Sequence, residues 1–241
     1  MLNIENLEKF TKQAQTSFIN VAREYCQHLF LSYLYRQNGS EKLLFKGGTA
    51  LRIVFRSPRY SEDLDFTGVN IKEEKIEEIF ANTLSDIENT GIKVEIIESK
   101  NTSGGYLGIA LFNVYGIKIQ IQIEVSLRNI KGVKGARALI DNDYIPAYTL
   151  VHLTMEDIIN GKLQALYSRK KPRDFYDYFF LLSGNYPIVK EKDNLHKVMD
   201  LIKEKDINFR NELKKFLPAS HATYLKDFEK ILESKIKTYI A

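Results

Sequence analysis

Residues 117–126 alternate strictly between apolar and polar side chains, and this pattern constrains the fold more than any other feature of the sequence. The apolar positions are Ile117, Ile119, Ile121, Ile123 and Val125. Successive side chains of an extended strand point to opposite faces, so the pattern is typical of a half-buried β-strand. Glu124 is expected on the polar face of that strand, beside a packed apolar face.

The spacing of apolar residues changes about two thirds of the way along the chain. The spacing of apolar residues predicts helices over 5–35, 49–55 and 76–87, and strands over 43–45, 64–66, 92–98 and 106–113. From about residue 150 the period is helical to the end. We therefore predict an α+β protein with two domains, an α+β domain over 1–145 that includes the N-terminal helix, and an α-helical domain over 146–241.

The composition excludes several classes of protein. The chain has 241 residues, of which 44% are hydrophobic, and this is ample for a packed core. The single cysteine, Cys26, excludes an internal disulfide framework and any multi-cysteine zinc site. No run approaches the ~20 apolar residues of a membrane span, and the N-terminus lacks the pattern of a signal peptide. We expect a cytoplasmic protein with no membrane partner.

The charges are unevenly distributed. Residues 62–98 hold 11 acidic and 3 basic side chains, so this segment carries −8 and the remainder +12, for the net charge of +4. Two basic stretches, 128–137 and 169–173, stand in that remainder. Such stretches are most often solvated loops, and phosphate contact is the alternative interpretation.

Asp63 and Asp65 are separated by one apolar residue in a predicted strand. Side chains two apart in a strand share a face, so the two carboxylates would lie side by side. Their repulsion favours a cation between them, and Mg²⁺ is the natural choice for oxygen ligands. A solvated acidic turn is the simpler alternative for an isolated Asp-x-Asp.

The sequence on either side of these aspartates supports a functional interpretation. Gly47, Gly48 and Thr49 join a strand to a helix, where backbone N–H groups can hold phosphate oxygens. Glu124 can supply a third carboxylate from a neighbouring strand. Three acids beside a glycine turn are typical of phosphoryl or nucleotidyl transfer. The four histidines show no spacing suited to a catalytic triad or a zinc site.

These residues also resemble a known pattern. Gly47-Gly48-Thr49, then Asp63-Leu64-Asp65-Phe66 and Ile123-Glu124-Val125, resemble the signature of the DNA polymerase β-like nucleotidyltransferase superfamily. More narrowly, residues 45–51 and 59–66 are similar to the AbiEii/AbiGii toxin family. A second block agrees with that family's helical motifs: Glu156-Asp157, Lys162 to Leu166, Arg169, and Arg173 to Asp177.

The resemblance implies a fold and a set of site residues. The fold would be a nucleotidyltransferase-type mixed sheet flanked by helices and followed by a helical domain. Asp63, Asp65 and Glu124 would bind metal, and Gly47, Gly48 and Thr49 would bind the nucleotide. Lys162 and Asp174 would act on the nucleotide as further catalytic residues. Glu124 departs from the aspartate that many superfamily members carry.

Two of these residues can also be interpreted from their local sequence. In a helix over 154–168, capped by Thr154, Lys162 lies within the apolar stripe. A buried lysine needs a carboxylate or phosphate, or else a stem that reaches solvent. Asp174 follows Pro172 closely, so it is either a nucleotide partner or a charge that complements the start of a helix.

We therefore expect a Mg²⁺-dependent enzyme that transfers a nucleoside monophosphate from an NTP to an acceptor. The resemblance implies a toxin of a type IV toxin–antitoxin or abortive-infection system, with a possible antitoxin and with the tRNA 3′ end as acceptor. A nucleotidyltransferase acting on a protein or small molecule is one alternative. A nucleotide-binding defence or regulatory module without transfer activity is the other.

Overall fold

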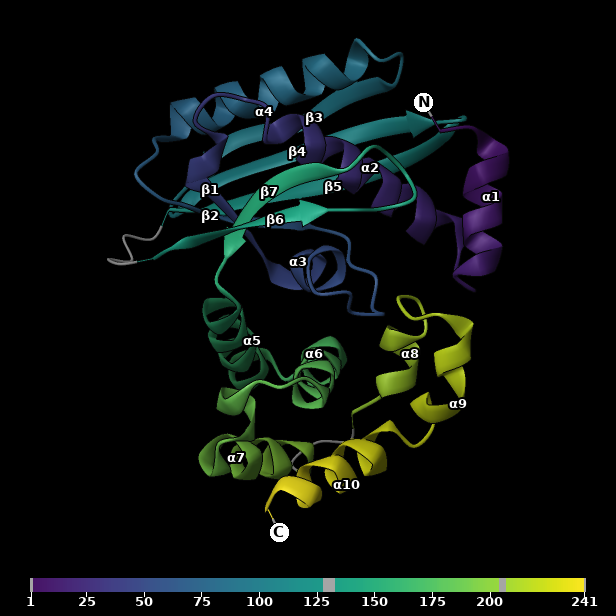
Figure 1. The fold of residues 1–241 in the computed structure, drawn as a ribbon, viewed down its shortest axis with the longest axis vertical. Coiled ribbons are helices and arrows are strands. Elements are labelled where there is room, and N and C mark those ends of the chain that lie inside the picture. Colours follow the sequence, from purple (N-terminus) through teal and green to yellow (C-terminus); the bar gives the residue numbers. More distant parts are fainter. Residues whose placement is uncertain (1, 128–132, 204–206, 241) are drawn as a thin grey trace. The chain divides into compact units, whose positions relative to one another are not determined.

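The computed structural model describes residues 2–127, 133–203 and 207–240, which form two compact units, Met1–Thr154 and Met155–Ala241 (Figure 1). The sequence-based division at 145/146 lies before strand β7 (Tyr148–Leu153). Because β7 pairs with two strands of the first unit, the observed division follows that strand.

The first unit is built on a seven-stranded sheet of order β3-β4-β5-β2-β1-β7-β6. The other strands are β1 (Leu43–Lys46), β2 (Leu64–Gly68), β3 (Lys93–Thr102), β4 (Gly105–Val114), β5 (Ile117–Ser126) and β6 (Gly135–Ile140). Strands β5 and β2 are parallel, as are β1 and β7, and the remaining neighbours are antiparallel. The expected α+β class with a mixed sheet is confirmed.

Helices cover this sheet. They are α1 (Ile4–Gln13), α2 (Phe18–Leu34), the short η1 (Ser40–Lys42), α3 (Gly47–Ile53) and α4 (Glu73–Glu88). Helices α2 and α4 pack against each other and on the strands, which buries the apolar face of β5. Residues 117–126 form one strand as predicted, with Ile119, Ile121, Ile123 and Val125 buried.

The single helix predicted over 5–35 is wrong, because the chain breaks between α1 and α2. Gln15 has a left-handed backbone with φ of 50°. The hydroxyl of Ser17 then accepts a hydrogen bond from the N–H of Asn20 and caps the start of α2. Apolar spacing continued across the break, so periodicity alone did not reveal the Ser cap. Strands β6 and β7 were also not predicted individually.

The second unit is helical, as expected. It contains α5 (Met155–Arg169), α6 (Pro172–Ser183), η2 (Pro187–Lys190), α7 (Lys192–Lys203), α8 (Phe209–Leu213), η3 (Ala219–His221), α9 (Ala222–Leu225) and α10 (Phe228–Ile240). Its core includes Leu166, Phe175, Leu181, Phe228 and Leu232, all buried. No helix among the described residues combines the length and apolar character needed to cross a membrane.

Candidate functional site

A glycine corner joins β1 to α3 and lies directly against Asp65. Gly47 has a φ of +85°, a region that side chains other than glycine rarely adopt. A Cβ atom at this position would lie 2.0 Å from Oδ2 of Asp65. Glycine is therefore required here both by the turn and by the close approach of the carboxylate.

The next glycine is covered by the loop that precedes β2. A Cβ atom on Gly48 would lie 2.7 Å from both the Arg59 guanidinium and the Ser61 hydroxyl. Arg59 is only 4% exposed, and its Nη1 donates a hydrogen bond to the carbonyl of Tyr60. The amide of Gln27 donates to the carbonyls of Ser61 and Glu62 and fixes the other end of the loop. Neither Arg59 nor Ser61 was predicted from the sequence to lie at the site.

Thr49 connects the corner to the first aspartate through the backbone. Its buried hydroxyl donates to the carbonyl oxygen of Asp63 at 2.5 Å. Strand β2 begins at Leu64, so Asp63 lies just before the strand rather than within it. The prediction that both aspartates lie on one strand was wrong for Asp63, because the residues before Leu64 belong to the loop held over the corner.

Asp65 and Glu124 are brought together by strand pairing. They are Cα partners in the parallel pair β2 and β5, so their side chains leave the same face of the sheet. Asp65 is half-buried and Glu124 is exposed. The amide of Gln122 donates to Oε1 of Glu124 at 2.5 Å and orients that carboxylate.

Lys46 flanks the same pair of acids. It is the partner of Asp65 in the antiparallel pair β1 and β2, so Lys46, Asp65 and Glu124 form one row across three strands. The Lys46 Nζ donates to the Ser126 hydroxyl on β5 at 3.3 Å. The row therefore sets an ammonium beside two carboxylates, an arrangement suited to a phosphate chain that arrives with a cation. Lys46 was part of the glycine motif but was not singled out from the sequence.

The predicted ligand set of three carboxylates is gathered only in part. Asp65 and Glu124 are register partners, whereas Asp63 lies outside the strand. Within the ranges that the structure describes, no group of three or more His, Cys, Asp or Glu side chains is arranged to hold a metal ion. The donor chemistry still suits Mg²⁺, which is usually bound by one or two carboxylates together with substrate phosphates.

In the second unit, Lys162 meets a carboxylate that sequence reasoning did not assign. Its Nζ lies 2.7 Å from Oδ2 of Asp177, whose side chain is 1% exposed. Lys162 lies on α5 and Asp177 on α6, so the ion pair ties the two helices together. The lysine within an apolar stripe was the signal that such a partner exists.

Asp174, the predicted catalytic acid of this block, has local partners. Its Oδ1 lies 2.6 Å from the Arg169 guanidinium, and its Oδ2 accepts a hydrogen bond from the backbone N–H of Lys171. The carboxylate thus satisfies a donor at the start of α6, as negative charge does at a helix N-terminus. Its action on a nucleotide stays a prediction.

The two basic stretches differ in how far they are described. Lys134 and Arg137 are exposed on or next to β6, while Arg128 and Lys131 lie outside the described residues. In the second stretch, Arg169 pairs with Asp174 and Arg173 lies 3.6 Å from Glu212. The exposed cations of β6 are therefore better placed for an external phosphate than these two arginines.

Comparison with known proteins gives one family match. Residues 29–237 match the model of a family described as nucleotidyl transferase AbiEii toxin, type IV toxin–antitoxin system. The match includes the glycine corner, all three carboxylates and the Lys162 ion pair. No curated protein matches the chain significantly.

Solved structures share the fold. The chain is similar to a protein from Helicobacter pylori described as a candidate nucleotidyltransferase, with a TM-score of 0.62 and 19% identity over 91% of this chain and 94% of that one. It is also similar to JHP933 from Helicobacter pylori, with a TM-score of 0.59 and 17% identity over 93% of each chain. These likenesses show that the chain shares its fold with these two proteins.

Proposed function

Because the chain belongs to the AbiEii nucleotidyltransferase family of type IV toxin–antitoxin toxins, we propose that it transfers a nucleoside monophosphate from an NTP to an RNA hydroxyl and releases pyrophosphate. The family makes the chain a nucleotidyltransferase and implies a nucleotide substrate and an antitoxin. The RNA acceptor, with the tRNA 3′ end as the preferred case, and the dependence on Mg²⁺ are our proposals.

The observation that carries the proposal is the row formed by Lys46, Asp65 and Glu124 beside the glycine corner. Asp65 and Glu124 would hold the metal, which when bound neutralises phosphate charge and lowers the pKa of an attacking hydroxyl. Asp63, fixed through Thr49, is the third proposed ligand. The exposed Glu124 carboxylate is also the group that would accept the proton of that hydroxyl.

The remaining residues bind the triphosphate in this proposal. The backbone N–H groups of Gly48 and Thr49 at the corner would donate to phosphate oxygens, with Gly47 providing the turn. Lys46 adds positive charge from the adjacent strand position. Lys162, which pairs with Asp177, would contact the negatively charged triphosphate, and Asp174 would orient the nucleotide.

An RNA acceptor is supported by charge. The chain carries +12 outside residues 62–98, and Lys134 and Arg137 are exposed near one edge of the sheet. Phosphate contacts of this kind give binding that weakens as salt rises. Exchanging Lys134 and Arg137 for glutamate should weaken RNA binding and reduce its salt dependence, and an unchanged salt slope would exclude this surface as the RNA contact.

The decisive experiment is a transfer assay in which RNA, proteins and small molecules are all offered as acceptors. Purified protein and Mg²⁺ are incubated with each labelled NTP, total RNA and cell lysate, and the products are resolved. We expect label in RNA from the unmodified protein, none after chelation with EDTA, and recovery when Mg²⁺ is restored. Label in protein or in a small molecule would contradict the RNA acceptor, and nucleotide binding without label would indicate a binding module.

A further inference from the structure

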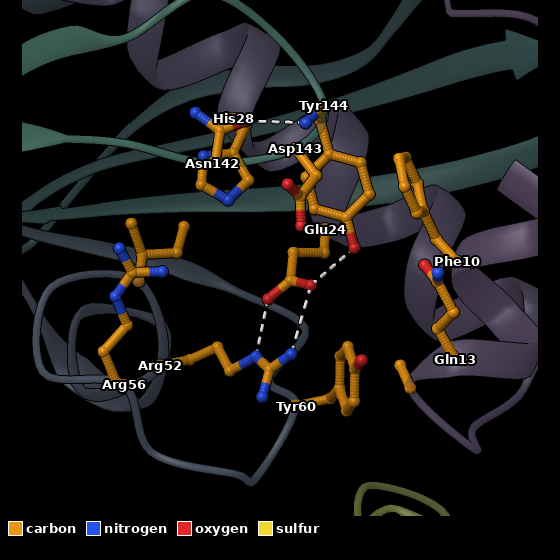
Figure 2. Close-up of a pocket in the computed structure, with 12 residues that line it drawn as sticks. Phe10, Gln13, Glu24, His28, Arg52, Arg56, Tyr60, Asn142, Asp143 and Tyr144 are labelled. Carbon is orange, nitrogen blue, oxygen red and sulfur yellow. Dashed lines mark hydrogen bonds and ion pairs between the residues drawn. The ribbon is translucent and has the colours of Figure 1, made fainter. Parts of the chain in front are cut away.

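A pocket of about 250 Å³ lies in the first unit, away from the row of charged residues described above. Its walls come from α1, α2, the C-terminal part of α3 and the loops that precede β2 and β7 (Figure 2). Pockets for drug-sized ligands measure roughly 300–1,000 Å³, so this smaller pocket suits a single ring system rather than a whole nucleoside triphosphate.

The charged groups of the pocket neutralise each other. The Arg52 guanidinium binds Glu24 through two hydrogen bonds, Nε to Oε1 at 2.6 Å and Nη2 to Oε2 at 3.2 Å. The Tyr144 hydroxyl donates to the same carboxylate at 2.8 Å, as Figure 2 shows. The Nη1 of Arg52 donates hydrogen bonds to the carbonyls of Ser57 and Pro58. This pair carries no net charge, and the other two charged residues that line the pocket, Arg56 and Asp143, have opposite signs, so the pocket as a whole does not favour a strongly ionic ligand.

An uncharged donor in the pocket wall lacks a partner. Asn142 lines the pocket, and its Nδ2 is buried with no hydrogen bond to any described residue. The amide orientation is fixed, because Oδ1 accepts from the N–H groups of Tyr144 and Ile145, both at 3.0 Å. An unpaired buried donor is costly, so Nδ2 calls for an acceptor that the chain does not supply.

A second polar group is neutral as well. His28 is 4% exposed, and its Nδ1 shares a hydrogen bond with the Tyr148 hydroxyl at 2.9 Å. Burial lowers the pKa of His28 to about 4. Its Nε2 has no partner among the described residues. A neutral imidazole in this position pairs with the polar edge of an uncharged ligand.

Aromatic rings provide the other walls. Phe10, Tyr60 and Tyr144 line the pocket, and the Arg52 guanidinium lies 3.9 Å from the centre of the Tyr60 ring. Aromatic rings and guanidinium planes are the surfaces on which bases stack, and uncharged polar edges give the hydrogen bonds. The combination fits a heteroaromatic ring with donors and acceptors on its edge.

The pocket is joined to the glycine corner by two short segments. Helix α3 has Gly47 at one end and Arg52 near the other, and its seven residues span about 10 Å. In the loop before β2, Tyr60 lines the pocket, while its neighbours Arg59 and Ser61 cover Gly48. A ring bound in this pocket and a phosphate bound at the row of Lys46, Asp65 and Glu124 could therefore belong to one short polynucleotide.

We infer that this pocket binds a nucleobase of the acceptor, close to the nucleotide that receives the transferred group. The inference rests on the proposed function, because it names the part of a polynucleotide acceptor that the first unit holds. The base stacks among the aromatic walls, and its edge pairs with Asn142 Nδ2 and His28 Nε2.

The test is equilibrium dialysis of the full chain with labelled adenosine, guanosine, cytidine and uridine, each alone, without Mg²⁺ or NTP. At least one nucleoside should bind. Asn142→Asp keeps the acceptor for the Tyr144 and Ile145 amides but removes the Nδ2 donor, so binding should weaken about tenfold. The matched control is Asn113→Asp, because Asn113 accepts from the N–H of Gly116 in a remote turn. That variant should bind like the unmodified protein.

A second variant tests the pocket by filling it. Ala14 lines the pocket and is half-buried, so Ala14→Phe should abolish nucleoside binding while thermal unfolding reports an intact fold. Asp65→Asn should retain nucleoside binding even if transfer is lost, so failure of transfer and failure of this inference are separately visible. The inference is overturned by no nucleoside binding, by binding that both pocket variants leave unchanged, or by binding lost in Asp65→Asn.

Discussion

Asp65 on β2 and Glu124 on β5 are register partners in a parallel strand pair, although α4, β3 and β4 separate them in the sequence. Their two carboxylates leave the same face of the sheet at a spacing of about 4.8 Å between strands. Each acid therefore has its role only in the folded sheet, and the pair can be tested one member at a time.

Removing either charge should abolish transfer without unfolding the protein. We expect Asp65→Asn and Glu124→Gln each to reduce NTP incorporation by about 100-fold or more, because each removes a proposed metal ligand. Labelled NTP incorporation measures the effect. Glu95→Gln, at an exposed acid on the edge strand β3, is the control. Retained transfer in Asp65→Asn or Glu124→Gln would remove that residue from the mechanism.

The glycine corner offers a matched pair of alanine variants. Gly47 and Gly91 have nearly equal positive φ values, +85° and +89°, but a Cβ atom on Gly91 would meet nothing within 4 Å. Both substitutions carry a backbone penalty of roughly 1–2 kcal/mol. Only Gly47→Ala should also displace the Asp65 carboxylate and abolish transfer. Equal activity of the two variants would show that the close approach of Asp65 is not needed.

Thr49 should act through its hydroxyl. Thr49→Val removes the hydrogen bond to the Asp63 carbonyl and is expected to lower the free energy of unfolding by about 1 kcal/mol. It should also reduce transfer, because Asp63 loses its anchor. Thr49→Ser keeps the hydroxyl and should recover most of the activity. If serine and valine are equally impaired in denaturant titrations and transfer assays, the hydroxyl is not the cause.

The two buried carboxylates on α6 should contribute different amounts to the free energy of unfolding. Asp177→Asn leaves the Lys162 ammonium, whose side chain is 13% exposed, without its anion, and we expect a loss of about 3 kcal/mol. Asp174→Asn leaves the Arg169 guanidinium, whose side chain is 48% exposed and stays hydrated, so a smaller loss of about 1 kcal/mol is expected. Urea titrations of both variants measure the difference. A larger loss at Asp174 would contradict this ranking.

His28 should make stability fall in acid. Burial lowers its pKa in the folded state from 6.5 to about 4, the Glu24 charge opposes this shift, and Arg52 and Arg56 reinforce it. Below pH 6.5 the unfolded chain binds a proton that the folded chain resists. The stability present above pH 6.5 is therefore lost progressively toward pH 4, by about 3 kcal/mol for this one group.

Denaturant titrations at several pH values measure this dependence. His28→Gln should remove that share of the slope between pH 6.5 and 4, whereas His196→Gln, at an exposed histidine of α7, serves as the control. If the slope of His28→Gln equals that of the unmodified protein, His28 does not carry the acid sensitivity.

Local sequence patterns were enough to predict the strand over 117–126, the helical C-terminal third, and the identity of the glycine corner and its acids. These features depend on local periodicity and on turn chemistry, which neighbouring residues fix directly. The break at Gln15 could not be predicted in this way, because the apolar spacing continues across it. Strands β6 and β7 were not predicted either, although at six residues each they are longer than β1 and β2, which were.

Which side chains contact each other depends on the folding of the whole chain. Strand register sets Lys46, Asp65 and Glu124 in one row and leaves Asp63 in the preceding loop. The packing of α5 against α6 pairs Lys162 with Asp177 and not with Asp174, which pairs with Arg169. Asp65 and Glu124 lie far apart in the chain, and Asp177 lies about one helical turn from a second aspartate, Asp174. The pairing of strands and the packing of helices choose between them, and no local pattern records that choice.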